Sequence, residues 1–232
     1  MQSAALKIKP YHATANNPLL FNPVLENILV IVKLNSTRLE YNNLTTIENL
    51  QATKYHQQKD ALSYSWRHHL LNTWLSNYCN KPFDQLNLKT TKEGKNYLDT
   101  LPFHFNISKS TTYLAFSFGP NPIGVDIETI KDFKPFMPIA DQHFHENEQL
   151  LLSEEKSPLS FFSIWTRKEA ILKANGSGIN DNLKNMDTTS ESHQMDSRIY
   201  QLETFANDEF IVSLAYQSTD PLLLKICNYN IL

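Results

Sequence analysis

Two carboxylates, Asp126 and Glu128, stand one residue apart in the run Gly124-Val125-Asp126-Ile127-Glu128. Because alternate residues of a β-strand share one face, both point the same way from a strand whose other face is apolar. Like charges this close repel each other, and a hard, oxygen-seeking cation such as Mg²⁺ compensates them most simply. The ordinary alternative is a strand with its polar face in water. This one segment leaves both interpretations open.

A second group of polar side chains lies in a predicted helix further along the chain. Trp165, Glu169 and Lys173 are spaced four residues apart, so they lie close to one stripe of that helix. Glu169 would complete a metal site with Asp126 and Glu128. Lys173 would then face an anion bound to that metal, and such a set suits phosphate chemistry. Taken alone, Glu169 and Lys173 are more typical of a surface ion pair than of a functional site.

The elements that must position these side chains are a mixture of strands and helices. Apolar or alternating runs predict strands at 28–34, 103–107, 113–119, around Asp126, and at 198–205, 210–215 and 222–226. Helical spacing predicts helices at 58–79, 138–155 and 159–174, and the polar stretch 175–198 predicts a long loop. The strand at 113–119 and the Asp126 strand are expected to form an antiparallel hairpin. The order of these elements favours an α+β fold.

Composition and charge favour a soluble cytoplasmic protein with no nucleic-acid partner and no membrane partner. The formal net charge of the 232 residues is −3, so nothing in the overall charge indicates a bulk nucleic-acid binder. The apolar run at 28–32 is too short to span a bilayer, and the first ten residues lack the core of a signal peptide. The two cysteines, Cys79 and Cys227, are expected to be reduced thiols.

A further cluster, His143, His145, Glu146 and Glu148, has the residue types of a metal site. In a helix, His145 and Glu148 lie on one side, but no further ligand is in view. We therefore interpret this cluster as the solvated face of a helix.

Several segments occur in an order and spacing typical of one enzyme family. They are Phe105-Asn106-Ile107-Ser108-Lys109-Ser110, the Asp126 run, residues 165–173, and Gly176-Ser177-Gly178, with Phe144 and Glu148 between the second and third. Over about residues 53–180 the chain resembles the 4′-phosphopantetheinyl transferases. The resemblance is to the larger single-chain kind, which activates peptide-synthetase and polyketide-synthase carriers.

The resemblance implies a fold of two similar α+β lobes, here residues 1–120 and 121–232, with coenzyme A in the cleft between them. It implies Mg²⁺-dependent transfer of 4′-phosphopantetheine from coenzyme A to a serine of an acyl- or peptidyl-carrier protein. The second product would be 3′,5′-ADP. A chain that holds both lobes is expected to act as a monomer.

The same resemblance implies roles for individual residues. Asp126, Glu128 and Glu169 would bind Mg²⁺ and form the catalytic set with Lys173. Glu169, or a metal-bound water, would take the proton of the attacking serine, with Glu128 a weaker candidate. Lys173 would stabilise the departing 3′,5′-ADP. The residues implied to contact coenzyme A are Lys95, Ser108, Lys109, Ser110 and Lys168.

Three positions depart from the family pattern, and all three concern coenzyme A recognition. Lys109 stands where the family usually has histidine, Asn96 where it has proline after Gly-Lys, and Ser63 where it often has arginine. These departures motivate an alternative function, a non-catalytic protein that binds a carrier or a nucleotide. A third, weaker hypothesis is an unrelated metal-dependent phosphohydrolase.

Overall fold

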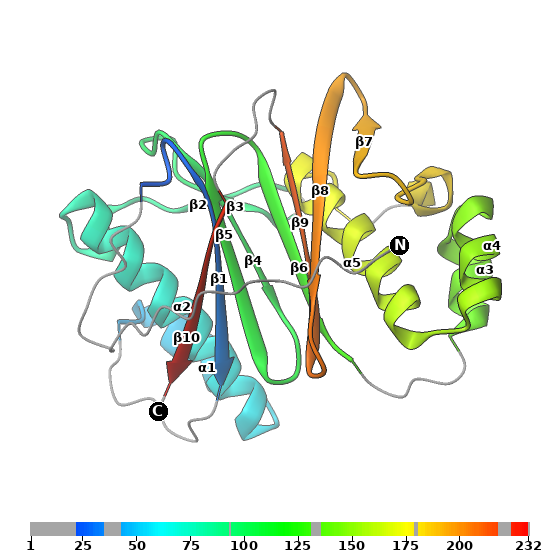
Figure 1. Ribbon diagram of the computed structural model, residues 1–232. Helices are drawn as coiled ribbons and strands as arrows, with labels where there is room; N and C mark the ends of the chain where they lie inside the picture. Colours follow the sequence, from blue (N-terminus) through cyan, green and yellow to red (C-terminus); the bar gives the residue numbers. More distant parts are fainter. Residues whose placement is uncertain are drawn as a thin grey trace.

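The computed structural model describes residues 22–231 except for 35–42, 93, 131–135, 179–180 and 218–223, with the backbone alone at 181–182 and 224–231. The described part mixes helices with two four-stranded sheets (Figure 1). The first sheet has the order β10-β1-β5-β4, with β1 at Asn27–Leu34, β4 at His104–Lys109, β5 at Tyr113–Gly119 and β10 at Leu224–Ile231. The second has the order β6-β9-β8-β7, with β6 at Ile123–Thr129, β7 at Ser192–Met195, β8 at Arg198–Ala206 and β9 at Phe210–Gln217.

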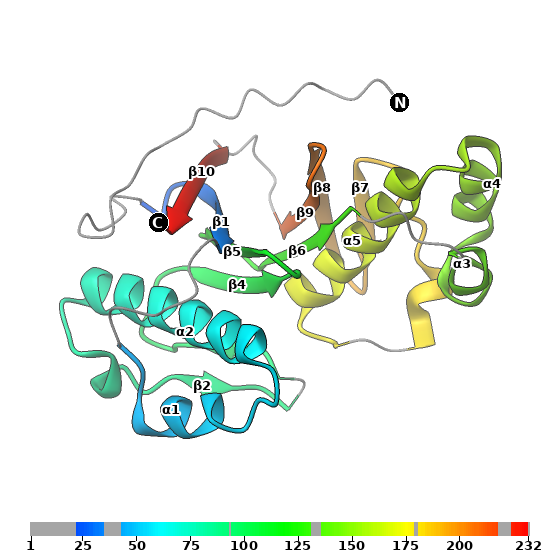
Figure 2. The same ribbon diagram turned by 90° about the horizontal axis from the view of Figure 1, so that it is seen from below.

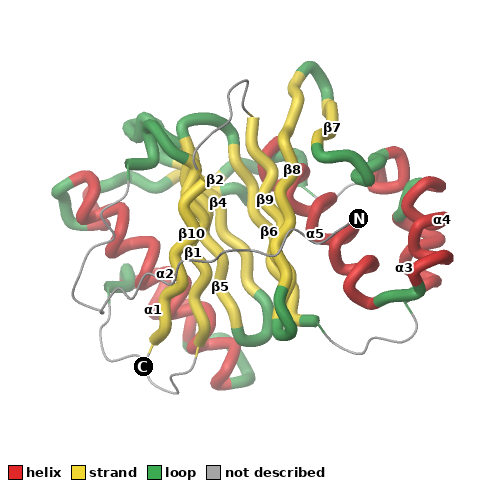
Figure 3. Tube along the Cα trace, in the orientation of Figure 1, coloured by secondary structure: helices red, strands yellow, loops and turns green. Residues whose placement is uncertain are grey.

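Helices flank the two sheets, and a small hairpin lies beside them. The helices are α1 (Thr46–Ala52), α2 (Gln58–Cys79), α3 (Met137–His143), α4 (Glu146–Glu155) and α5 (Pro158–Asn175), with 3₁₀ turns η1 (Phe83–Gln85) and η2 (Asp181–Asn185). The hairpin consists of β2 (Lys89–Thr90) and β3 (Asn96–Tyr97). The strands run through the middle of the molecule, between α2 and α5 (Figure 3). Within the described residues, no helix is long and apolar enough to cross a bilayer.

Helix α2 covers one face of the first sheet (Figure 2). Its buried Leu71, Trp74 and Leu75 recur at helical spacing, and they share a core with Phe116 and Phe118 of β5. The helix ends at Asn80, whose φ of 49° is left-handed. The helix predicted at 58–79 is confirmed to the residue.

The opposite face of the first sheet packs against the second sheet. Leu29 and Ile31 of β1 share a core with Val125 and Ile127 of β6 and with residues of β9. Since neighbouring residues of a strand face opposite ways, β1 is buried by α2 on one face and by the second sheet on the other. The apolar side of the Asp126 strand is therefore in the core, as its sequence predicts.

The predicted hairpin between 113–119 and the Asp126 strand is wrong. β5 pairs with β1 and β4, whereas β6 pairs with β9 in the other sheet, where Asp126 lies opposite Ser213. The connection contains Pro120 and Pro122, which have no N–H to donate to a continuing ladder. The chain therefore leaves the first sheet here and begins the second.

The last strand returns to the first sheet. β10 pairs in parallel with β1, with Leu224 beside Asn27. A division of the chain at residue 120 remains a prediction, but this pairing puts the segment 224–231 on the sheet of the first half. The side chain of Cys227 lies outside the described residues, while Cys79 is a free cysteine.

Two predicted boundaries differ from the structure in the second half. The helix predicted at 138–155 is broken into α3 and α4, because Phe144 and His145 are extended and His145 caps α4. The loop predicted at 175–198 contains η2 and β7. The helix predicted at 159–174 is confirmed as α5.

Candidate active site

The site lies where β4 of the first sheet meets β6 of the second. Asn106 and Ser108 alternate along β4 and so share one face. The Asn106 side-chain oxygen accepts a hydrogen bond from the Val125 N–H at 3.1 Å, and the Ser108 hydroxyl donates to Asp126 Oδ1 at 2.7 Å. These polar side chains replace a backbone ladder between the two sheets, which explains the asparagine and serine at alternate positions.

Gly124 allows α5 to lie directly on β6. A Cβ at this position would be 2.2 Å from the Ala170 carbonyl oxygen and 2.3 Å from the Ala174 nitrogen, far inside van der Waals contact. Because Gly124 shares its face with Asp126, the close approach puts the Glu169–Lys173 stripe of α5 over that face.

Asp126 lies at the centre of a short chain of polar contacts. Its side chain is 7% exposed, and its Oδ1 accepts from the Lys173 ammonium at 2.6 Å as well as from Ser108. Lys173 also donates to the Ser108 hydroxyl at 3.0 Å. The other oxygen, Asp126 Oδ2, is buried and has no hydrogen-bond partner among the described residues. The ion pair therefore satisfies only one side of this carboxylate.

Glu169 is the second incompletely satisfied carboxylate. It is buried, and its Oε1 has no hydrogen-bond partner within the described part of the chain. Burial raises the pKa of Glu169, the negative charge of Asp126 raises it further, and Lys173 opposes both effects. Glu169 is therefore close enough to Asp126 and Lys173 for their charges to act on its pKa.

Glu128 lies further along β6, beside an apolar cavity. It is partly buried, and it lines a cavity of about 220 Å³ together with Ile139, Phe161, Phe162 and Trp165. Trp165 belongs to the same stripe of α5 as Glu169, so the whole stripe faces β6. A role of Glu128 as a metal ligand stays a prediction.

The donor set at Asp126 and Glu169 fits a magnesium ion. Across the described ranges, no three His, Cys, Asp or Glu side chains are grouped closely enough to hold a metal by themselves. Asp126 Oδ2 and Glu169 Oε1 are nevertheless buried carboxylate oxygens without partners, which is costly unless a cation or a donor compensates. Mg²⁺ is commonly held by one or two carboxylates, with water and substrate phosphates completing its shell. The two oxygens meet that requirement.

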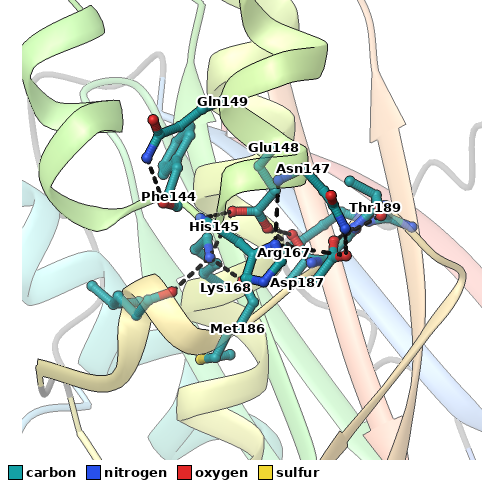
Figure 4. A network of polar contacts seen from close by, with 12 residues as sticks. Phe144, His145, Asn147, Glu148, Gln149, Arg167, Lys168, Met186, Asp187 and Thr189 are labelled. Atoms are coloured by element: carbon teal, nitrogen blue, oxygen red, sulfur yellow. Dashed lines mark hydrogen bonds and ion pairs between the residues drawn. The ribbon is translucent and has the colours of Figure 1, made fainter.

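Lys168, the neighbour of Glu169, lies in a different and closed network (Figure 4). Its ammonium is 2.7 Å from Glu148 Oε2, and both side chains are fully buried. It also donates to the carbonyl of Leu183 at 2.7 Å and to that of Met186. Burial lowers the pKa of Lys168, and Glu148 opposes that shift. The implied contact of Lys168 with coenzyme A finds no support in this position.

Glu148 completes the closed network. Its Oε1 accepts from the backbone N–H and the hydroxyl of Thr188 at 2.8 and 2.7 Å, and its Oε2 accepts from the His145 N–H at 2.9 Å. Arg167 donates to the Thr188 carbonyl at 2.5 Å. The interpretation of Glu148 as part of a solvated helix face is wrong, because these contacts bury it between α4, α5 and the segment after η2. Its spacing from His145, that of a capping box, is the sequence signal for this role.

The remaining predicted contacts to coenzyme A are spread over the boundary between the halves. Lys95 donates to the carbonyls of Lys173 and Ala174 at the end of α5. Lys109 is exposed. Ser110, just beyond β4, accepts a hydrogen bond from the Thr129 hydroxyl at 3.0 Å. Of this group, Ser108 is the residue whose hydroxyl contacts both the Asp126 carboxylate and the Lys173 ammonium.

Comparison with known proteins now adds to the geometry. Residues 122–227 match the 4′-phosphopantetheinyl transferase superfamily. The 4′-phosphopantetheinyl transferase gsp of Aneurinibacillus migulanus is 33% identical over 129 residues, which are 54% of this chain and 53% of that protein. The 4′-phosphopantetheinyl transferase psf-1 of Bacillus pumilus is 37% identical over 102 residues, 42% of this chain and 43% of that protein. The 4′-phosphopantetheinyl transferase Sfp of Bacillus subtilis (strain 168) is 34% identical over 98 residues, 40% of this chain and 43% of that protein.

The matched parts amount to about half the length of these curated relatives or less. They agree with the order of motifs in the sequence and with the mixed helix and sheet architecture. The predicted resemblance is therefore confirmed: the chain is similar to the 4′-phosphopantetheinyl transferase superfamily over residues 122–227 and to three of its named members.

Proposed function

We propose that this protein transfers the 4′-phosphopantetheine group of coenzyme A to a serine of an acyl- or peptidyl-carrier protein and releases 3′,5′-ADP. The observation that carries the proposal is the pair of buried, unpartnered oxygens on Asp126 and Glu169 beside the Lys173 ammonium. The names of three relatives support the same reaction. We further propose that the two sheets belong to two lobes, with coenzyme A between them, and that the protein is a cytoplasmic monomer.

Asp126 and Glu169, with Glu128 on the same face of β6, would hold a magnesium ion. When bound, that ion supplies positive charge that neutralises the pyrophosphate of coenzyme A and orients it. The buried setting of Asp126 and Glu169 strengthens such electrostatic interactions, because water screens them little.

The chain's own residues would carry the proton and the leaving group. The serine oxygen of the carrier forms a bond to the β-phosphorus of coenzyme A, and the bond from that phosphorus to the oxygen of 3′,5′-ADP breaks. Glu169 would accept the serine proton, since one of its buried carboxylate oxygens, Oε1, has no hydrogen-bond partner among the described residues. Lys173 would stabilise the negative charge that develops on the departing phosphate.

The direct test is a mass measurement. The protein is incubated with coenzyme A, Mg²⁺ and several apo-carrier proteins, and a gain of one phosphopantetheine arm on a carrier is expected. A known transferase working in parallel shows that the carriers are competent. No gain on any carrier would contradict the proposal.

Calorimetry with coenzyme A, combined with the transfer assay, distinguishes the proposed transferase from a non-catalytic binding protein. Tight binding without transfer would favour a non-catalytic nucleotide-binding protein. Release of inorganic phosphate from generic phosphoesters would instead indicate a phosphohydrolase.

A further inference from the structure

Lys95 reaches from the turn between β2 and β3 to the end of α5. Its ammonium donates to the carbonyl oxygens of Lys173 at 2.8 Å and Ala174 at 2.9 Å. Its stem passes Gly176, where an added Cβ would be 3.5 Å from Lys95 Cδ. The side chain thus lies against the last turn of the helix and binds its backbone.

The last turn of α5 leaves these two carbonyls without partners in the helix. The last four carbonyls of any α-helix lack intrahelical donors. Gly176, at φ +78°, closes α5 with its own N–H on the Leu172 carbonyl at 2.8 Å, and Ser177 donates to the same carbonyl at 3.3 Å. The Lys173 and Ala174 carbonyls come next, and Lys95 supplies a donor to each. A positive charge is also favourable at this end of the helix dipole.

The contact fixes Lys173 at both ends. Lys95 binds the carbonyl oxygen of Lys173, while the ammonium of Lys173 lies 2.6 Å from Asp126 Oδ1. A lysine side chain is flexible, so the position of its backbone decides where the ammonium can reach. The backbone of Lys173 is therefore set by a residue of the first half of the chain, although α5 belongs to the second.

We propose that Lys95 is a positioning residue, which caps the C-terminus of α5 and thereby holds Lys173 against Asp126. This inference rests on the proposed function and goes beyond the family resemblance, which implies a nucleotide contact for Lys95. The immediate surroundings agree with a backbone contact. Burial, with the nearby charge of Arg198, lowers the pKa of Lys95 to about 8, and the two carbonyls are the hydrogen-bond acceptors of its ammonium.

Steady-state kinetics with Lys95→Met tests the role. Loss of the cap is expected to lower kcat about tenfold, because Lys173 is displaced, and to leave KM for coenzyme A unchanged. Lys95→Arg, which keeps a cationic donor, is expected to restore most of kcat. Lys184→Met is the matched control, since Lys184 donates to the Asp141 carbonyl at 2.9 Å in α3, away from the site.

Binding of two nucleotides separates positioning from direct recognition. Coenzyme A and dephospho-coenzyme A differ by the 3′-phosphate, and Lys95→Met is expected to leave the affinity for both unchanged. A loss of about tenfold or more for coenzyme A alone would mean that Lys95 binds that phosphate, and would overturn the proposal.

Hydrogen exchange gives a reading that does not depend on catalysis. The amides of residues 173–177 are expected to exchange faster in Lys95→Met than in the wild type, and Lys184→Met is expected to leave them unchanged. Unchanged exchange in Lys95→Met would overturn the cap even if the transferase activity is confirmed. If the wild-type protein shows no transfer but the amides still exchange faster in Lys95→Met, the cap is retained and the proposed function is rejected. Lys95→Gln serves as a second truncation if Lys95→Met does not fold.

Discussion

Two lysine–carboxylate pairs meet on helix α5, and they differ in how completely their polar atoms are paired. The Lys168–Glu148 pair is fully buried, and both carboxylate oxygens of Glu148 accept hydrogen bonds. In the Lys173–Asp126 pair the lysine side chain is 29% exposed, and Asp126 Oδ2 has no partner among the described residues. We call Lys168–Glu148 the closed pair and Lys173–Asp126 the open pair. We infer that the closed pair is structural and propose that the open pair binds a ligand through the unpartnered oxygen. A buried carboxylate indicates a functional site when its hydrogen bonding is incomplete, and a structural role when it is complete.

The largest expected effect is on stability, at the closed pair. Lys168→Met leaves Glu148 charged and buried without its cation, which costs about 3–5 kcal/mol of the free energy of unfolding. Urea denaturation measures this loss. The double variant Lys168→Met with Glu148→Gln removes the buried charge and is expected to recover part of it. A loss below about 1 kcal/mol, the range of exposed pairs, would mean that the two networks do not differ in this way.

The next effect is on catalysis, at the open pair. Asp126→Asn and Glu169→Gln are each expected to lower kcat/KM about 10²–10³-fold, because each removes charge from the centre of the site. Transfer to an apo-carrier is measured, with circular dichroism to establish folding. Glu209→Gln, at an exposed carboxylate, is the matched control. Retained activity in both site variants would remove Asp126 and Glu169 from the mechanism.

A third prediction concerns Glu48, a carboxylate in the first half of the chain whose two oxygens both accept hydrogen bonds. Burial alone would raise its pKa, but hydrogen bonds from His68, Thr45 and Asn72 lower it from the ordinary 4.5 to about 2. A lowered pKa stabilises the fold above the unfolded pKa, and this stability is lost as pH falls from about 4.5 through about 2.

Glu48→Gln should therefore cost about 3 kcal/mol or less at neutral pH and flatten the acid limb of the stability curve. Urea unfolding between pH 7 and pH 2 measures both. An acid limb that Glu48→Gln leaves unaltered would show that the hydrogen bonds do not hold this carboxylate ionised.

The smallest expected effect concerns the cation at Asp126. Because the Lys173 ammonium already occupies one oxygen of Asp126, it opposes a second cation there. Lys173→Met is expected to tighten binding of Mg²⁺ about tenfold in the absence of coenzyme A. Calorimetry with the metal alone measures this affinity. Weaker binding in the variant would show that Lys173 and the metal do not compete for Asp126.

Local periodicity predicted much of the fold and the open pair. Helices α2 and α5 follow from apolar and polar spacing, and the i, i+4, i+8 stripe placed Glu169 and Lys173 on one face. The alternation in β6 placed Asp126 on the polar side of a buried strand. These features depend on neighbours within a few residues, which the sequence displays directly.

The closed pair and the strand pairing depend on distant partners. Lys168 and Lys173 lie on the same helix and have the same side chain, but they differ in burial. Lys168 is fully buried because Glu148 and the carbonyls after α5 surround it. The pairing of β6 with β9 in place of β5 likewise depends on a strand much later in the chain. The contact of Lys95 could not be predicted from its neighbours either, since the carbonyls that bind it belong to the other half of the chain.

The parallel pairing of β10 with β1 has a consequence for the order of folding during synthesis. Helix α2 and strands β1, β4 and β5 are translated before the second sheet begins, and they can collapse early around their shared core. Strand β1 then keeps one unpaired edge until residues 224–231 emerge from the ribosome. Through this interval a nascent chain presents an open β-edge, and residues 224–231, translated long after β1, close it.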